Sequence, residues 1–515
     1  MATPRQDITN AESGLGQGEF RKELGLFDSI MIVAGIMVGS GIFIVSAEIS
    51  RQVGSAQWLL VTWIITGVLT VAGALSYGEL AAMMPEAGGM YVYLREAFSP
   101  LLGFLYGWTL LTVIQTGTIA AVAIAFARFS GVAFPFISET NYVIAPIHVL
   151  PGYALSLSTA QVTALGIILL IAVINSYGVQ WGKLIQNVFT VAKLTGMVAL
   201  LVLGVVAFHL HPGVLHSNFA GGWTPHHVVP IGSISAITAF GMFVALCVSQ
   251  TGSLFSADSW HDITFVAGEV RNPKRNLPLA LGLGTSLVIL LYLLCNLCYL
   301  AVLPLHAIQT APNDRVATLV VATVLPAVGK LAMGLLIMVS TFGTVNALTL
   351  AGARACYAMA QDGLFFRRAG TLNKAHVPGW ALGLQCLWSL FLVLPRTYDR
   401  STGQYGNLYS NLLDYVISAA LLFYILTVAG LFRLRHTRPD APRPYRAWGY
   451  PWLPALYILG SAIVLAVLSC YRTATTWPGL LIIASGVPVY FFLRRKSKHR
   501  LSSQLSNSLP EIGQI

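Results

Sequence analysis

Residues 32–45 read IVAGIMVGSGIFIV, an apolar stretch with the small residues Gly35, Gly39, Ser40 and Gly41 near its middle. Each glycine costs a helix about 1 kcal/mol relative to alanine, and the Gly-Ser-Gly sequence concentrates that cost in one turn. Two interpretations follow. Either the helix unwinds at this turn and bare backbone lines a cavity, or Gly35 and Gly39 form a GxxxG surface for close helix packing.

The amino-acid composition indicates whether water or lipid surrounds this stretch. The chain has 515 residues, of which 56% are hydrophobic and 10% are charged, and its mean hydropathy is +0.72. A soluble domain carries roughly 25% charged residues. The low charge and high hydropathy also exclude a disordered protein, and six cysteines in this length exclude a disulfide scaffold. We therefore interpret the chain as an all-α polytopic membrane protein.

Twelve stretches are apolar enough to cross a membrane, which takes about 20 residues. The eighth is too long for one crossing, and its first part is a candidate external loop helix. The twelve predicted transmembrane helices cover residues 29–50, 58–84, 101–130, 159–177, 185–208, 233–266, 277–304, 316–359, 379–395, 407–433, 451–471 and 477–493.

The positions of the basic residues orient these spans. With a cytosolic amino terminus, 22 of the 30 Lys and Arg residues lie on the inside and 7 outside, while Lys193 lies within a span. This is the positive-inside pattern, so we expect a multi-pass protein of the cell membrane with both termini cytoplasmic. The net charge of +11 then reflects topology and the lipid bilayer, not a nucleic acid partner. The basic clusters 433–446 and 494–500 are expected to be solvated loops.

A second interruption lies in residues 240–269, where Ser-Ala-Asp-Ser at 256–259 breaks an apolar run. An isolated charge at the bilayer centre costs at least about 2.5–3.5 kcal/mol, so Asp258 should face protein or water. The alternative is that Asp258 caps a helix end near the interface. Interrupted helices at equivalent places in two halves are typical of inverted-repeat transporters, whose binding site lies at the breaks.

The exposed ends of two broken helices favour one class of ligand. The amino terminus of a half-helix presents N–H groups and about half a positive charge, which suits a carboxylate. The carboxyl terminus of a half-helix presents carbonyl groups, which suit an ammonium group. An α-amino acid carries both groups on one carbon.

Five motifs, taken in order, make the chain resemble the amino acid–polyamine–organocation (APC) superfamily, and its L-type amino acid transporter branch with bacterial permease relatives most of all. The motifs are GSGIF at 39–43, SYGELAAMMPEAGGMYVYLREAF at 76–98, NVFTVAKL at 187–194, FVAGEVRNPKRNLPLAL at 265–281 and FGTVN at 342–346.

The resemblance implies the leucine-transporter fold, a 5+5 inverted repeat with broken helices 1 and 6. The implied divisions are a cytosolic tail at 1–25, a first repeat at 26–208, a second repeat at 233–434, helices 11 and 12 at 451–493 and a cytosolic basic tail at 494–515.

The resemblance also implies that both breaks bind the substrate. Asp258 departs from the small residue usual in this branch, which leaves three roles open for it: to favour a cationic side chain, to bind a proton or to cap the broken helix. The implied substrate-binding set consists of backbone N–H groups at Ser40, Gly41 and Ile42, carbonyls near Met37, Gly39, Phe255 and Ser256, and the Phe255 ring that closes over the substrate.

Lys193 lies about midway along its predicted span, where a lysine is unusual. One interpretation is that its side chain extends to the membrane interface. In sodium-independent members of the superfamily a lysine takes the place of a sodium ion. By that resemblance Lys193 would bridge the carbonyls near Gly35 and the hydroxyls of Ser340 and Thr341, and could couple transport to protons.

These observations predict a sodium-independent secondary transporter of α-amino acids, either a proton symporter or an exchanger. A polyamine or amine exchanger and a non-transporting amino acid sensor are the alternatives. No G-x-S-x-G, HExxH or P-loop occurs, so no enzyme, cofactor or metal is expected. Residues 129–156 contain no cysteine, so we expect no disulfide-linked glycoprotein subunit of the kind bound by animal light chains.

Overall fold

The computed structural model describes residues 22, 24–86, 88–177, 179–210, 212–373, 375, 377–399 and 403–508, with backbone only at 179–190, 210, 399 and 495–508. The predicted tail 1–25 therefore lies almost wholly outside the described residues. The predicted tail at 494–515 begins as helix, because the last helix continues to Ser508.

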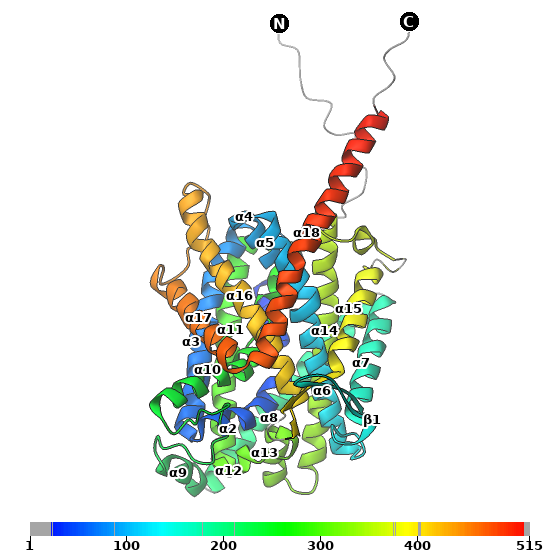
Figure 1. Cartoon of the computed structure of the whole chain (residues 1–515). Helices are drawn as coiled ribbons and strands as arrows, with labels where there is room; N and C mark the ends of the chain where they lie inside the picture. Colours follow the sequence, from blue (N-terminus) through cyan, green and yellow to red (C-terminus); the bar gives the residue numbers. More distant parts are fainter. Residues whose placement is uncertain are drawn as a thin grey trace, which may run out of the picture.

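Most of the described chain is helical (Figure 1). The first nine α-helices are α1 (Leu26–Met37), α2 (Gly41–Val53), α3 (Ala56–Met83), α4 (Met90–Ala97), α5 (Pro100–Thr109), α6 (Gln115–Ala133), α7 (Thr159–Ser176), α8 (Val179–Leu210) and α9 (Pro212–Ala220). The others are α10 (Ala239–Ser256), α11 (Pro273–Val302), α12 (Leu305–Gln309), α13 (Val316–Val324), α14 (Gly329–Gln361), α15 (Gly379–Val393), α16 (Leu408–Thr437), α17 (Trp452–Tyr471) and α18 (Thr473–Ser508). A π-helical turn, η1 (Leu110–Ile114), joins α5 to α6, and three 3-10 helices are η2 (Trp260–Glu269), η3 (Pro312–Asp314) and η4 (Arg367–Gly370).

Local sequence sets many helix starts. Ser55 accepts a hydrogen bond from the Trp58 N–H at the start of α3, and Ser158 forms a capping box with Gln161 at the start of α7. Thr238 and Asn407 cap α10 and α16 in the same way. Each cap satisfies a first-turn N–H group that has no acceptor within its own helix.

The predicted spans coincide with these helices. Within the described residues, 10 helices are long and apolar enough to cross a membrane, and α1 with α2 forms a bent pair that passes the same test together. The span predicted at 379–395 corresponds to α15, which has 15 residues and is shorter. The long eighth stretch divides into α13 and α14, as its length suggested. The chain is therefore a polytopic helical membrane protein, and the number twelve stays a prediction.

A small β-sheet corrects the all-α expectation. Strands β1 (Tyr142–Leu150), β2 (Tyr153–Ser158), β3 (Pro395–Asp399) and β4 (Gln404–Tyr405) pair antiparallel in that order. Ala154 lies opposite Arg396, and Tyr398 lies opposite Tyr405. Residues 142–158 are uncharged and rich in β-branched side chains, which favour strands over helix, and they are too short to cross a membrane.

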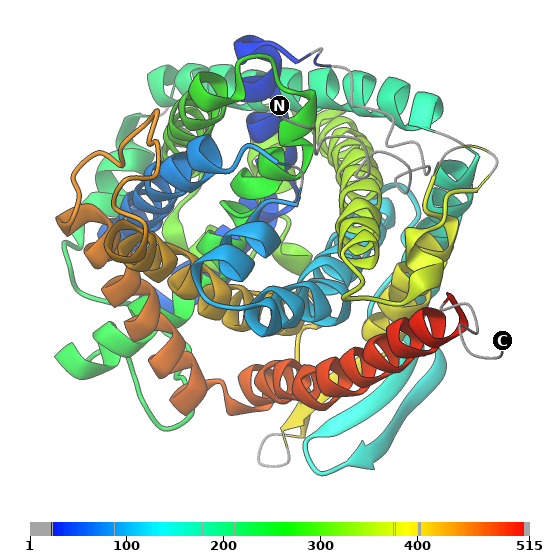
Figure 2. The same cartoon turned by 90° about the horizontal axis from the view of Figure 1, so that it is seen from above.

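The helices surround one continuous buried core. α3 packs along α11, and α6 packs along α14. α17 and α18 lie at one edge of the bundle, and the β1–β2 hairpin projects beyond α18 (Figure 2). We call the end with α4 and the end of α18 the inner end, and the opposite end, with α9 and α12, the outer end (Figure 1).

Candidate functional site

The first predicted break is present. α1 ends at Met37, α2 begins at Gly41, and the two axes bend by 47°. The Val38 N–H closes α1 on the Ala34 carbonyl at 3.0 Å, and the Gly39 N–H turns back to the Met37 carbonyl at 2.8 Å. The first N–H groups of α2 have no acceptor within that helix, so they are donors available at the break.

The second predicted break is present as well. α10 ends at Ser256, and the chain is non-helical through Ala257 and Asp258. Ser259 then takes a left-handed conformation, with φ of 66°. The chain resumes at Trp260 as the 3-10 helix η2, not as a regular α-helix.

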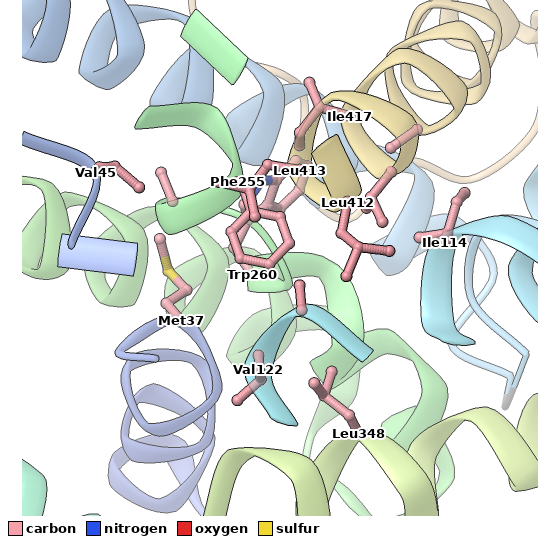
Figure 3. Packing of buried hydrophobic residues seen from close by; sticks show 14 of the residues in the cluster. Met37, Val45, Ile114, Val122, Phe255, Trp260, Leu348, Leu412, Leu413 and Ile417 are labelled. Atoms are coloured by element: carbon pink, nitrogen blue, oxygen red, sulfur yellow. The ribbon is translucent and has the colours of Figure 1, made fainter. Parts of the chain in front are cut away.

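The two breaks touch each other. A Cβ atom on Gly41 would lie 2.9 Å from the Ser256 Cα and 2.1 Å from its Oγ, so only glycine allows this approach. The structure thus brings Gly41 and Ser256 together, although 215 residues separate them. Met37 and Phe255, at the ends of α1 and α10, belong to one buried cluster with Trp260 and with Leu412 of α16 (Figure 3).

Tyr292 of α11 connects the carbonyl ends of both broken helices. Its hydroxyl lies 2.8 Å from the Met37 carbonyl and 2.9 Å from the Ser256 carbonyl, and the side chain is fully buried. The Met37 carbonyl also accepts the Gly39 N–H, so both of its lone pairs are used. The sequence reasoning missed this residue.

Two further residues of α11 hold α2 in place. Asn296 accepts a hydrogen bond from the Ser46 hydroxyl at 2.7 Å, and the Tyr299 hydroxyl donates to the Ile42 carbonyl at 3.1 Å. Tyr292, Asn296 and Tyr299 share one helix face because they are four and three residues apart. A polar stripe in an otherwise apolar helix is the signal that could have found them.

Tyr409 of α16 is a second residue that the sequence reasoning missed. Its hydroxyl lies 3.0 Å from the Ser40 Oγ, and its ring meets the Phe255 ring edge-on, with 6.1 Å between centroids. The Arg128 guanidinium lies 5.5 Å from the centre of the same ring. Phe255 and Tyr409 thus pack together beside Ser40.

Asp258 is buried and faces the inner half of α16. Its Oδ1 accepts a hydrogen bond from the Tyr424 hydroxyl at 2.5 Å. The side chain is 7% exposed, so it is shielded from solvent.

Lys193 of α8 is buried, and its ammonium group donates to the Gly35 carbonyl on α1. The other half of the predicted bridge is different. The Ser340 hydroxyl has no hydrogen-bond partner among the described residues, and the Thr341 hydroxyl donates to the Ile337 and Met338 carbonyls of its own helix. The structure therefore brings Lys193 to helix 1 but forms no hydrogen bond from it to these two hydroxyls.

Comparison with known proteins agrees with this arrangement. Residues 24–493 match the family described as amino acid permease. The rat protein "Large neutral amino acids transporter small subunit 2" is 31% identical over 495 residues, covering 93% of this chain and 82% of the rat protein. The rat "b(0,+)-type amino acid transporter 1" is 30% identical over 502 residues, covering 95% and 91%. The "Serine/threonine exchanger SteT" of Bacillus subtilis is 26% identical over 480 residues, covering 92% and 98%.

The chain belongs to the amino acid permease family. The family and these relatives are transporters, so this permease is not an enzyme.

The permease has a narrow recess on the outer side of the breaks. The Arg472 guanidinium lies beside it, 3.6 Å from Glu48 and 3.8 Å from Asp414. The lining residues come from α2, α10, η3 and α16: Ile44, Val45, Glu48, Ile49, Gln52, Ser249, Thr251, Gly252, Asp314, Tyr409, Ser410, Leu413 and Asp414.

Ion pairs close the inner end of the permease. Glu79 of α3 is fully buried and accepts bonds from Arg435 at 2.6 Å and from the Ala447 N–H at 2.7 Å, with Arg443 at 3.3 Å. The basic segment 433–446, expected to be a solvated loop, therefore supplies two partners for a buried carboxylate. Nearby, the hydrogen bond from Arg438 lowers the pKa of the Glu96 carboxyl below its ordinary value. Ion pairs thus connect separate helices at both ends of the permease, because Arg51 and Arg128 also pair with Asp314 at the outer end.

Proposed function

We propose that this permease is a sodium-independent secondary transporter of α-amino acids that works by alternating access, as a proton symporter or an exchanger. One observation carries the proposal: the amino-terminal end of α2 and the carboxyl-terminal ends of α1 and α10 meet at the contact between Gly41 and Ser256. Free N–H groups and carbonyl groups at one point match the two charged groups of a zwitterion.

The substrate carboxylate binds the N–H groups at Ser40, Gly41 and Ile42 in this proposal. The ammonium group binds at the carbonyl ends of α1 and α10, near Met37, Gly39, Phe255 and Ser256. Because the single proton of the Tyr292 hydroxyl is shared between two of these carbonyls, the ammonium group competes with it. Tyr292 then acts as a positioning residue that holds both helix ends together while the site is empty.

The leucine-transporter architecture completes the proposal. It comprises twelve helices, with repeats at 26–208 and 233–434, helices 11 and 12 at 451–493, and both termini in the cytoplasm, so that the inner end faces the cytosol. Lys193 replaces a sodium ion by donating to the Gly35 carbonyl.

No disulfide-linked subunit is part of the proposal. The segment between α6 and α7, residues 134–158, contains no cysteine. Within the described residues it forms the β1–β2 hairpin.

The test is an uptake panel with the full chain purified and reconstituted into liposomes. Labelled leucine, serine, alanine, arginine and putrescine are offered with and without sodium, and with and without a pH gradient. We expect saturable uptake of at least one α-amino acid that does not depend on sodium. Rejection of every α-amino acid would contradict the proposal.

A polyamine or amine exchanger is the second candidate, favoured by the buried Asp258 carboxyl in the break after α10. A second ammonium group of such a substrate would pair with it. Uptake of putrescine without any α-amino acid would select this candidate. Binding without flux would instead select a non-transporting sensor.

A further inference from the structure

Three ionisable side chains are buried on the inner side of the break that follows α10. Asp258 lies in the break, and His261 and Asp262 lie in the first turn of η2. They are 7%, 3% and 5% exposed, respectively. An aspartate in a first helical turn ordinarily reaches water, so the burial of Asp262 needs an explanation.

Tyr424 of α16 connects these side chains into a series of polar contacts. Its hydroxyl donates to Asp258 Oδ1 at 2.5 Å and lies 3.5 Å from His261 Nδ1. On the other side of the imidazole, His261 Nε2 lies 3.5 Å from Asp262 Oδ1. Asp262 Oδ2 is buried and has no hydrogen-bond partner among the described residues.

The surrounding groups are mostly tyrosines, contributed by four helices. Tyr77 and Trp260 pack in contact, with ring centroids 4.7 Å apart, and Tyr77 also faces His261. In the described part of the chain, the hydroxyls of three of these tyrosines lack hydrogen-bond partners. The tyrosines are Tyr77 of α3, Tyr93 of α4, Tyr106 of α5 and Tyr457 of α17, and the three without partners are Tyr77, Tyr93 and Tyr106.

Charged groups on the neighbouring elements are engaged elsewhere. Asp28 of α1 accepts the Gly25 N–H, Arg354 of α14 pairs with Glu269, and Lys193 of α8 donates to Gly35. Glu79 of α3 pairs with Arg435 and Arg443, and Tyr292 of α11 donates to helix-end carbonyls. Over the residues that the structure describes, no Lys or Arg forms an ion pair with Asp258 or Asp262.

Two carboxyl groups so placed cannot both be ionised. A buried carboxylate without a cation loses its hydration, and a second negative charge nearby adds repulsion. The Tyr424 hydroxyl compensates Asp258 in part, whereas Asp262 Oδ2 has no partner among the described residues. Acidic groups that interact in this way titrate as a unit, and the contacts through Tyr424 and His261 connect these two carboxyl groups. The three ionisable groups and Tyr424 thus form a site whose ligand is a proton.

We propose that Asp258, Tyr424, His261 and Asp262 form a proton relay that couples proton movement to transport. The inference rests on the proposed function and specifies its coupling ion. A proton taken up by a carboxylate of the pair neutralises the buried site. When the inner end opens to water, the carboxylic acid releases the proton on that side. Asp258, two residues from Ser256, connects the relay to the substrate site.

The first experiment measures protons and amino acid together. The reconstituted full chain, with a pH-sensitive dye inside the liposomes, receives labelled leucine, serine or arginine. We expect amino acid entry to acidify the interior in the wild type. In Asp262→Asn the ratio of protons to amino acid should fall to background, and Tyr424→Phe should lower it. The matched control Asp28→Asn, an exposed carboxylate at the inner end, should keep the wild-type ratio.

The second experiment needs no substrate. Infrared spectroscopy of the purified full chain follows the carbonyl band of protonated carboxyl groups as the pH is raised. We expect a titrating band in the wild type and in Asp28→Asn that is lost in Asp262→Asn. Because the band is read on the wild type first, the proposal stays testable even if a variant fails to fold.

The outcomes separate this inference from the proposed function. Amino acid uptake without proton movement and without a titrating band would overturn the relay and leave transport intact. A wild-type proton ratio in Asp262→Asn would also overturn it. A titrating band lost in Asp262→Asn, with no uptake of any amino acid, would support the proton site and contradict the proposed function.

Discussion

The two helix breaks share a geometry but differ in chemistry. The break between α1 and α2 is made of glycine, serine and backbone, and α-helix continues on both sides of it. The break after α10 leads into a 3-10 helix and carries buried Asp258, His261 and Asp262. The break between α1 and α2 thus offers fixed dipoles, whose charge does not depend on pH. The break after α10 instead offers side chains that can gain and lose protons. In the proposed function both breaks bind the substrate, and only the break after α10 adds buried groups that can exchange protons.

Gly41→Ala should have the largest effect of these substitutions, because it forces the two breaks apart. The new Cβ would lie 2.9 Å from the Ser256 Cα, and rotation of the serine side chain does not relieve a clash with backbone. We expect uptake to fall to the level of empty liposomes. Gly166→Ala on α7 is the control, because its Cβ would meet nothing within 4 Å. Wild-type uptake by Gly41→Ala would show that the contact between the breaks is not part of the site.

Lys193→Ala should have the next largest effect on uptake, through the first break, because Lys193 contacts α1. It removes the ammonium donor to the Gly35 carbonyl. A hydrogen bond to a charged group contributes about 1.5–3 kcal/mol, so uptake should fall at least about tenfold. Lys330→Ala, at the exposed start of α14, should leave uptake unchanged. Equal rates in the two variants would refute the role of Lys193 as an ion substitute.

Tyr292→Phe tests the link between the two breaks. It removes the one hydroxyl proton that the Met37 and Ser256 carbonyls share, at about 0.5–1.5 kcal/mol in all. We expect a lower Tm and an altered KM for uptake. Tyr299→Phe also removes one donor, but it contacts only the Ile42 carbonyl of α2, so it should change KM less. The reverse order would mean that α11 supports only α2.

Ser259→Gly, in the break between α10 and η2, should have the smallest effect, and we expect it in the stability of the protein. A left-handed residue other than glycine costs about 1–2 kcal/mol, part of which the greater freedom of glycine in the unfolded chain offsets. We expect a slightly higher Tm than wild type in thermal unfolding. Ser259→Ala keeps the strain and serves as the control. If both variants unfold at the same temperature, the φ of 66° at Ser259 carries no strain.

Local features of the sequence predicted much of the fold. The apolar runs predicted the helices, and the breaks at 38–40 and 257–259 fall within the stretches expected to unwind. The sheet was not predicted, although β1 and β2 form a local hairpin. Its third strand pairs residues 395–397 with residues 153–155, which lie far away in the chain. The partners of Glu79 escaped for the same reason, since Arg435 and Arg443 look like ordinary loop charges in sequence.

Composition by itself determined that this chain folds in a bilayer. Glycine at 39 and 41 and the small polar residues at 256–259 determined where its helices weaken, because hydropathy and helix propensity are properties of neighbouring residues. Only the packing of the bundle decided which groups meet at the weak points. Tyr292 reaches Met37 across 255 positions, and Tyr424 reaches Asp258 across 166. Such hydrogen bonds depend on the distances and angles between helices that are remote in sequence, and no local pattern specifies those.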